Sequence, residues 1–135
     1  MKFHAIRGMF RTSVARAAVI STAVVLAACA TTSMPAKVSS GAFTDQKGMT
    51  LYTFDKDATG SGKSVCNGPC AANWPAFAAT GSDSAMGDWS VVTRDDGMKQ
   101  WAYKGKPLYT FAKDTAPGEM KGDGFLNGAW HTAKP

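Results

Sequence analysis

The chain has 135 residues and a formal net charge of +5, with 15 lysines and arginines against 10 aspartates and glutamates. The first 28 residues contain four basic residues and no acidic one, so the rest of the chain carries 11 basic and 10 acidic residues, a net charge of +1. This near-neutral remainder gives no support to a nucleic-acid partner, and we expect none.

Residues 1–28 have the pattern of a lipoprotein signal peptide and are set aside from the fold. A basic segment is followed by an apolar stretch at residues 17–28, which is shorter than the roughly 20 residues that a membrane-spanning helix needs. The stretch ends in LAAC, which resembles the bacterial lipobox. The resemblance implies cleavage before Cys29 and acylation of this cysteine, so we expect a membrane to be the partner of the lipid on Cys29. An ordinary secretory signal with a chance cysteine is the alternative.

Residues 29–40 are predicted to be a lipidated N-terminus and flexible tether, because the stretch ATTSMPAKVSSG at residues 30–41 is small, polar and aperiodic. Ala30 follows the cysteine at a position where an aspartate would argue for the inner membrane. We therefore expect a lipid anchor in the cell envelope, in the outer membrane and facing the periplasm if the cell is Gram-negative. Residues 41–135 are predicted to form a single globular domain.

One phrase occurs twice in this domain: LYTFDKD at residues 51–57 and LYTFAKD at residues 108–114. Tyrosine and phenylalanine stand two apart and share one face of a strand, while leucine and threonine take the other face. A Lys-Gly pair precedes each copy and supplies a turn. Each copy therefore predicts a strand, a turn and a second strand.

The predicted fold class is mostly β: a small antiparallel domain made of two related hairpin-containing halves, at about residues 41–80 and 89–135. Six short strands are expected. They are Gly41–Asp45, Leu51–Phe54, Ser90–Arg94, Met98–Tyr103, Leu108–Phe111 and Ala129–Ala133. One short helical turn is expected near residues 69–74, because the residue before Pro75 avoids the α region.

Cys66 and Cys70 allow three interpretations. A disulfide is favoured, because the protein is expected outside the cytoplasm and the intervening Asn-Gly-Pro turn brings the two residues close. A copper or redox site is the second interpretation, with the distant His131 as a weak further ligand. A zinc site lacks the usual four ligands. We expect no metal and no cofactor, with copper as the alternative.

Asp57 and Asp114 each follow a strand and precede a loop rich in small residues and proline or glycine. Such an aspartate accepts hydrogen bonds from loop N–H groups two or three residues later and fixes the turn. The alternative joins both carboxylates in a catalytic or cation-binding site. We favour the structural role, and we expect Tyr52 and Tyr109 in the core, with their hydroxyls near the aspartates, rather than as rings that stack on a ligand.

These motifs together resemble the bacterial secreted-repeat lipoprotein family, defined by a Tyr-x4-Asp motif with an aromatic residue two positions after the tyrosine. The cysteine-tryptophan stretch CNGPCAANWPAF and the C-terminal GAWHTAKP add to the resemblance. The family motif falls on Tyr52, Phe54 and Asp57 and again on Tyr109, Phe111 and Asp114. The resemblance implies export, and it implies no particular activity because none is established for the family.

Catalysis is not expected, since the sequence shows neither a nucleophile with a positioned base nor a phosphate-binding glycine loop. The four tryptophans are consistent with either a packed core or an exposed ligand-binding face. We predict a non-catalytic, lipid-anchored cell-envelope protein with a binding or structural role, whose protein or glycan partner the sequence does not identify. The alternative is a periplasmic copper-binding or redox accessory protein that uses Cys66 and Cys70.

Overall fold

The computed structural model describes residues 18–20, 22–25 and 33–135. Cys29 and most of the predicted signal peptide lie outside these residues. The chain divides into two units, residues 1–31 and 32–135, and the fold belongs to the second. None of the described helices combines the length and the apolar character that crossing a membrane requires.

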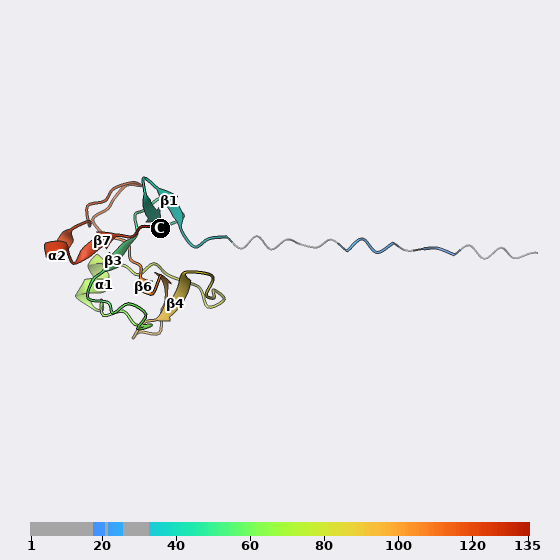
Figure 1. Cartoon of the computed structure of the whole chain (residues 1–135), viewed down its shortest axis with the longest axis horizontal. Helices are drawn as coiled ribbons and strands as arrows, with labels where there is room; N and C mark the ends of the chain where they lie inside the picture. The colour runs from blue at the N-terminus through green and yellow to red at the C-terminus, as the bar shows by residue number, and fades with distance from the viewer. Residues whose placement is uncertain (1–17, 21, 26–32) are drawn as a thin grey trace, which may run out of the picture. The chain divides into compact units, whose positions relative to one another are not determined.

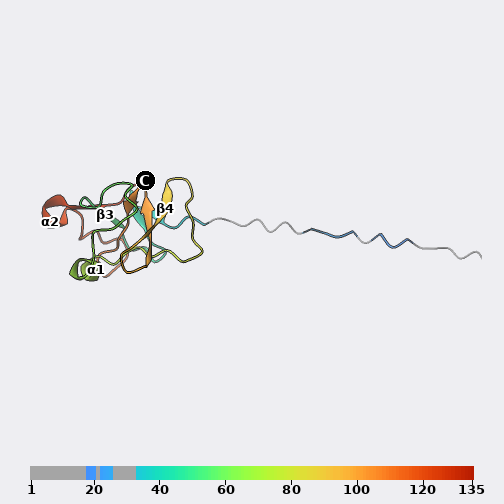
Figure 2. The same cartoon turned by 90° about the horizontal axis from the view of Figure 1, so that it is seen from below.

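The regular structure of the described residues consists mostly of short antiparallel strands, which confirms the predicted fold class (Figure 1). In chain order the elements are β1 (Lys37–Ser39), β2 (Ala42–Thr44), β3 (Tyr52–Phe54), α1 (Pro69–Asn73), β4 (Trp89–Thr93), β5 (Lys99–Tyr103), β6 (Lys106–Pro107), α2 (Phe125–Gly128) and β7 (Trp130–Thr132). They form three small sheets, β1-β2, β3-β7 and β4-β5-β6. Figures 1 and 2 both place α1 and α2 at the same end of the domain.

The folded domain begins before residue 41, the boundary that the sequence predicted. Ala36 is buried, and β1 pairs with β2 in the register Lys37↔Thr44 to Ser39↔Ala42. Residues 37–40 therefore belong to a hairpin rather than to the tether. The three side chains of β1 are exposed, whereas those of β2 are all buried. The pairing of β1 thus depends on backbone hydrogen bonds, which leave no apolar pattern in the sequence.

The two predicted Lys-Gly turns differ in the structure. Lys104 and Gly105 both have positive φ and join β5 to β6 as a two-residue hairpin turn. A Cβ atom on Gly105 would lie 2.8 Å from the backbone nitrogen of Gly60, so this position requires glycine. The first copy has a wider loop, in which the carboxylate of Asp45 accepts hydrogen bonds from two backbone N–H groups.

Leu108–Phe111 was predicted to be a strand, but in the structure it forms only isolated bridges at Tyr109. One of these bridges joins the two halves. The N–H of Tyr52 donates to the carbonyl of Tyr109 at 2.8 Å, and the N–H of Tyr109 donates to the carbonyl of Tyr52 at 3.0 Å. The two copies of the repeated phrase therefore run antiparallel and meet at their tyrosines.

The halves also exchange their last segments. Near the C-terminus, β7 pairs with β3 of the first half, and the N–H of Ala133 donates to the carbonyl of Leu51 at 2.8 Å. The equivalent bond in the other direction joins the end of the first half to the repeated phrase of the second: the N–H of Phe77 donates to the carbonyl of Leu108, also at 2.8 Å. Each half thus supplies the last segment that pairs with the repeated phrase of the other half, while β1-β2 and β4-β5-β6 each lie within one half.

Alternate side chains of the repeated phrase point into two different hydrophobic clusters. The two leucines, Leu51 and Leu108, lie in one cluster with Ala36, Phe43, Trp89, Trp101 and Ala133. The aromatic residues of the phrase lie in the other cluster, which consists of Tyr52, Phe54, Cys66, Trp74, Tyr109, Phe111 and Trp130. All four tryptophans are buried, so they fill the interior and do not form an exposed ligand-binding row.

Candidate functional site

The four polar side chains of the family motif meet inside the aromatic cluster, and each pair joins the two halves. The hydroxyl of Tyr52 donates to Oδ2 of Asp114 at 2.5 Å. The hydroxyl of Tyr109 donates to Oδ2 of Asp57. All four residues are buried, so the tyrosine of each half is held by the aspartate of the other half.

Each aspartate uses its second oxygen to fix the loop that follows it. Oδ1 of Asp57 accepts the N–H of Val65 at 2.7 Å, and Oδ1 of Asp114 accepts the N–H of Lys121 at 3.0 Å. These bonds fix the loops, which is the role that the sequence favoured, although the donor N–H groups stand seven or eight residues after the aspartate rather than two or three. Sequence spacing predicted the loop contact but not the tyrosine of the other half.

The two tyrosine hydroxyls have one further partner each. The hydroxyl of Ser64 lies 2.6 Å from that of Tyr109, and the N–H of Gly122 donates to the hydroxyl of Tyr52 at 3.3 Å. A Cβ atom on Gly122 would lie 2.6 Å from the ring of Trp74, so glycine lets this loop close over the tyrosine. Every buried polar side-chain atom within the described residues has a hydrogen-bond partner.

Arg94 is a buried member of this network that the sequence reasoning missed. Its guanidinium donates to Ser64 Oγ at 2.9 Å, to Gln100 Oε1 at 2.7 Å and to the carbonyl of Cys66. A buried charge needs such partners, and here Ser64 connects it to the Tyr109–Asp57 pair. The only signal in the sequence was an arginine at the end of a predicted strand, which is too common to single out.

Burial shifts the acid–base behaviour of the network. Loss of solvation raises the pKa of Asp57 above its ordinary value, while hydrogen bonds from Tyr109 and Val65 and the charge of Arg94 act in the opposite direction. Burial, reinforced by the hydrogen bonds to the aspartates, raises the pKa of Tyr52 and of Tyr109 well above the ordinary tyrosine value. Both tyrosines therefore stay protonated and act as donors rather than as bases.

We expect the raised pKa of Asp57 to appear in the pH dependence of stability. The folded state holds this proton more tightly than the unfolded state, so the contribution of Asp57 to stability falls as the pH rises from its unfolded pKa through its folded pKa. The difference in free energy of unfolding between the wild type and Asp57→Asn should then increase as the pH is lowered from neutrality towards about 4. Urea denaturation across this range measures it, with the exposed Asp96→Asn as a control. A difference that decreases on acidification would contradict the assignment.

The candidate metal ligands are not assembled into a site. Cys66 and Cys70 form a disulfide, with an S–S distance of 2.03 Å and a Cα–Cα distance of 5.2 Å. The exposed ring of His131 lies elsewhere, with Nε2 at 2.9 Å from Oδ2 of Asp55. Across residues 33–135 and the few described residues before them, no group of three or more histidine, cysteine, aspartate or glutamate residues is placed to hold a metal ion.

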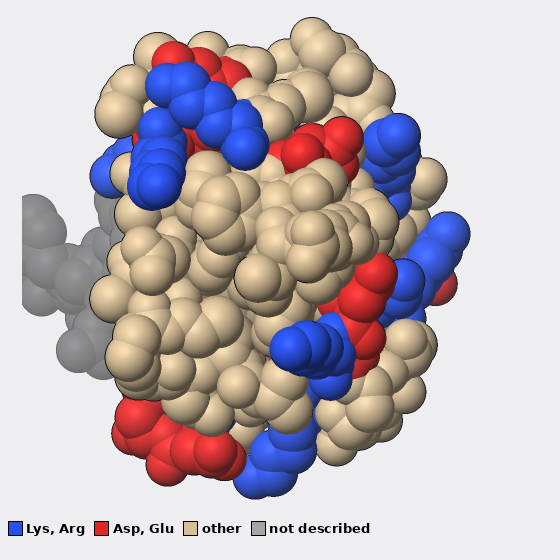
Figure 3. Space-filling view, turned by 90° about the vertical axis from the view of Figure 1, so that its left-hand side faces the viewer, with Lys and Arg blue, Asp and Glu red and all other residues tan. Residues whose placement is uncertain are grey.

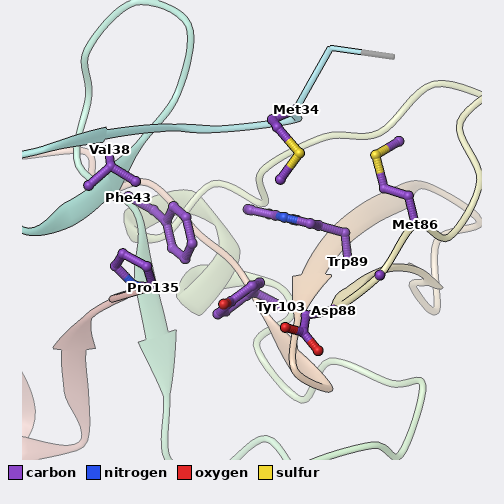
Figure 4. Close-up of a pocket in the computed structure, with 9 residues that line it drawn as sticks. Met34, Val38, Phe43, Met86, Asp88, Trp89, Tyr103 and Pro135 are labelled. Atoms are coloured by element: carbon purple, nitrogen blue, oxygen red, sulfur yellow. The ribbon is translucent and has the colours of Figure 1, made fainter.

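An open apolar pocket of about 510 Å³ lies beside β1, away from the buried motif (Figure 4). Its walls include the rings of Phe43, Trp89 and Tyr103, whose centroids are 4.7 to 5.1 Å apart. Met34 and Val38 form its edge, and their side chains are 54% and 56% exposed. The sequence reasoning missed this pocket, because the residues that form it come from four separate segments.

A second pocket of about 290 Å³ adjoins the first at Tyr103, which lines both. Its lining is basic and contains Lys104, Lys106 and Lys134 together with His131. The amino group of Lys104 lies 5.2 Å above the ring of Tyr103, a cation–π contact at the boundary between the two pockets. One face of the domain thus places an apolar pocket next to three lysines.

The face at the α2 end has a different character. Basic and acidic side chains alternate around its margin, and its centre carries neither kind (Figure 3). Phe125 and Leu126 of α2 are 42% and 52% exposed. Leu126 and Asn127 have positive φ, so α2 is an irregular turn that the sequence did not predict.

The comparisons with known proteins agree with the duplication. A family model described as a secreted repeat of unknown function matches the chain twice, at residues 37–78 and 90–134. No curated protein and no solved structure matches the chain. The two matched ranges correspond to the two halves that exchange their last segments, and the first begins with β1. They cover more than half of the chain, which therefore belongs to the family of secreted repeats of unknown function.

Proposed function

We propose that this secreted protein is a lipoprotein of the cell envelope, anchored through Cys29, and that its domain has a non-catalytic binding role. The observation that carries the non-catalytic part is the burial of the family motif. Tyr52, Asp57, Tyr109 and Asp114 all bond inside the core, where no substrate reaches them. The family motif therefore stabilises the fold, and a binding site would lie on the surface of the domain.

The anchor is supported by the sequence around Cys29. Export of a secreted repeat requires a leader, and the LAAC sequence at the end of the apolar stretch resembles the site at which bacterial lipoproteins are acylated. Ala30 in the next position favours the outer membrane in a Gram-negative cell. Several acyl chains on one residue hold a protein stably to a bilayer, since each buried methylene contributes about 0.8 kcal/mol.

We expect Cys29→Ser to release the protein from the membrane. In the native host, or in a bacterium that processes lipoproteins, the wild type should partition into the detergent phase of Triton X-114 and incorporate labelled palmitate. The variant should appear in the aqueous phase without label. Cys66→Ser/Cys70→Ser is the matched control, because it removes two other cysteines and should leave labelling unchanged. Labelling of Cys29→Ser, or aqueous partition of the wild type, would contradict the anchor.

The copper-binding or redox alternative would require thiolates at Cys66 and Cys70. Thiolates, and not disulfide sulfurs, are the ligands that bind copper(I). Cys66 is fully buried in the disulfide form, and its carbonyl accepts a hydrogen bond from Arg94. The bonds around this loop thus favour a structural disulfide over a metal site.

A further inference from the structure

We propose that the face with the two adjoining pockets docks on the anionic lipid surface of the membrane that carries the protein. This face is formed by the apolar pocket beside β1 and by the lysine pocket next to it, and we call it the docking face. The inference deepens the proposed function and rests on the anchor at Cys29 for its geometry. The occupant is a bilayer with anionic headgroups, and three observations favour it.

The first observation is the length of chain between the anchor and the docking face. Met34 lines the apolar pocket and is five residues from Cys29. Five residues span at most about 18 Å when fully extended. The tether predicted from the sequence was more than twice as long, and it would have allowed the domain to stand clear of the headgroups. With the shorter connection, the rim of the apolar pocket stays close to the membrane whatever conformation the connection adopts.

The second observation is the chemistry of that rim. Met34 and Val38 are large apolar side chains that are more than half exposed, and they border a pocket walled by Phe43, Trp89 and Tyr103. Apolar side chains backed by tryptophan and tyrosine are the residues that proteins place at the boundary between headgroups and acyl chains. An exposed apolar surface of this kind costs free energy in water, and this cost is removed when the surface is inserted between lipids.

The third observation is charge. Lys104, Lys106 and Lys134 line the second pocket, immediately beside the apolar one. Among the residues that line these two pockets, Asp88 is the one acidic residue; Asp55 pairs with His131 of the second pocket, and Asp83 lines a further pocket that shares Met34 and Met86 with the apolar one. Lysines therefore outnumber carboxylates in the lining of the two pockets, although residues 29–135 as a whole carry a net charge of only +1. Lysines at an anionic membrane surface strengthen binding, and they act only within about a Debye length.

The test uses residues 30–135, which lack Cys29 and contain every strand, helix and buried residue of the described fold. Binding is measured by co-sedimentation with vesicles of phosphatidylcholine alone and of phosphatidylcholine mixed with phosphatidylglycerol, over a titration of lipid. We expect binding to the mixed vesicles and much weaker binding to the neutral ones. Lys106→Glu/Lys134→Glu should weaken binding to mixed vesicles by about tenfold or more. Met34→Ser/Val38→Ser should weaken it as well, because the apolar rim is lost.

The control is Lys113→Glu/Lys121→Glu, which makes the same change in net charge at the α2 end. Lys113 lies there, with its amino group 6.0 Å from the ring of Phe125, and Figure 1 shows α2 at the left end of the domain, apart from β1 at its upper edge. This pair should leave vesicle binding unchanged. The circular dichroism spectrum and thermal midpoint of each variant confirm that it is folded.

Three results would overturn the proposal: no binding to mixed vesicles, equal weakening by both charge-reversal pairs, or tight binding of a free fatty acid to the domain without vesicles. The last would assign the docking face to a soluble ligand. Because the tested chain has no Cys29, a negative result contradicts docking and leaves the anchor intact. A result in the Cys29→Ser experiment that contradicts the anchor is a separate outcome, and a positive vesicle result would not reverse it.

Discussion

Replacing Trp130 with alanine is expected to lower the free energy of unfolding by about 3 to 5 kcal/mol. Trp130 is 1% exposed and lies at the centre of the aromatic cluster. Its ring stacks on Trp74 at 3.7 Å and on Phe54 at 4.2 Å, and it meets the edge of Tyr109 at 5.1 Å. Alanine would leave a cavity that rings from both halves cannot fill, because their positions are set by the exchanged segments. A small domain has only about 5 to 15 kcal/mol of stability to lose.

Urea denaturation followed by circular dichroism measures this effect without relying on the removed tryptophan. Phe125→Ala is the matched control, since Phe125 belongs to the same set of ring contacts but is 42% exposed. We expect this control to cost less than about 1 kcal/mol. If both variants lose the same stability, the central position assigned to Trp130 is wrong.

Replacing Asp114 with alanine is expected to cost about 2 to 4 kcal/mol of stability. The substitution removes two hydrogen bonds to a carboxylate, one from the hydroxyl of Tyr52 and one from the N–H of Lys121. It also leaves the buried tyrosine hydroxyl without its charged acceptor, and an unsatisfied buried polar group costs about 1 to 3 kcal/mol. Asp96→Ala, in an exposed turn, is the control and should cost less than about 1 kcal/mol.

Double-mutant cycles test which tyrosine belongs to which aspartate. Tyr52→Phe combined with Asp114→Ala should show a coupling energy of about 1 to 3 kcal/mol, because the two residues share a hydrogen bond. Tyr52→Phe combined with Asp57→Ala should be additive within about 0.5 kcal/mol, although these two residues belong to the same copy of the motif. Coupling within a copy and not between copies would refute the exchange between halves.

The family motif acquires a physical meaning from this arrangement. A tyrosine and an aspartate five positions apart do not bond to each other in this chain; each bonds to its counterpart in the other copy. A single copy would therefore leave a buried hydroxyl and a buried carboxylate unpaired, at a cost that a small domain cannot easily offset. This explains why the motif occurs twice in so short a chain.

The sequence by itself determined the local features of this protein. The alternation in LYTF predicted which side chains share a face, and the structure sends Leu51 into one cluster and Tyr52 and Phe54 into the other. The duplication, the helical turn before Pro75, the secreted family and the Cys66–Cys70 disulfide were likewise readable, because each depends on residues close together in the chain or on a repeated pattern.

Tertiary structure alone decided the pairing of distant segments. Backbone hydrogen bonds determine the exchange of β7 with the segment around Phe77 and the pairing of β1. Contacts with distant side chains determine the burial of Arg94. Such contacts leave no periodic signal, since any exposed or mixed segment can supply a backbone donor and acceptor. The docking face has the same origin: its rings and lysines come from separate segments, and only the folded chain brings them together.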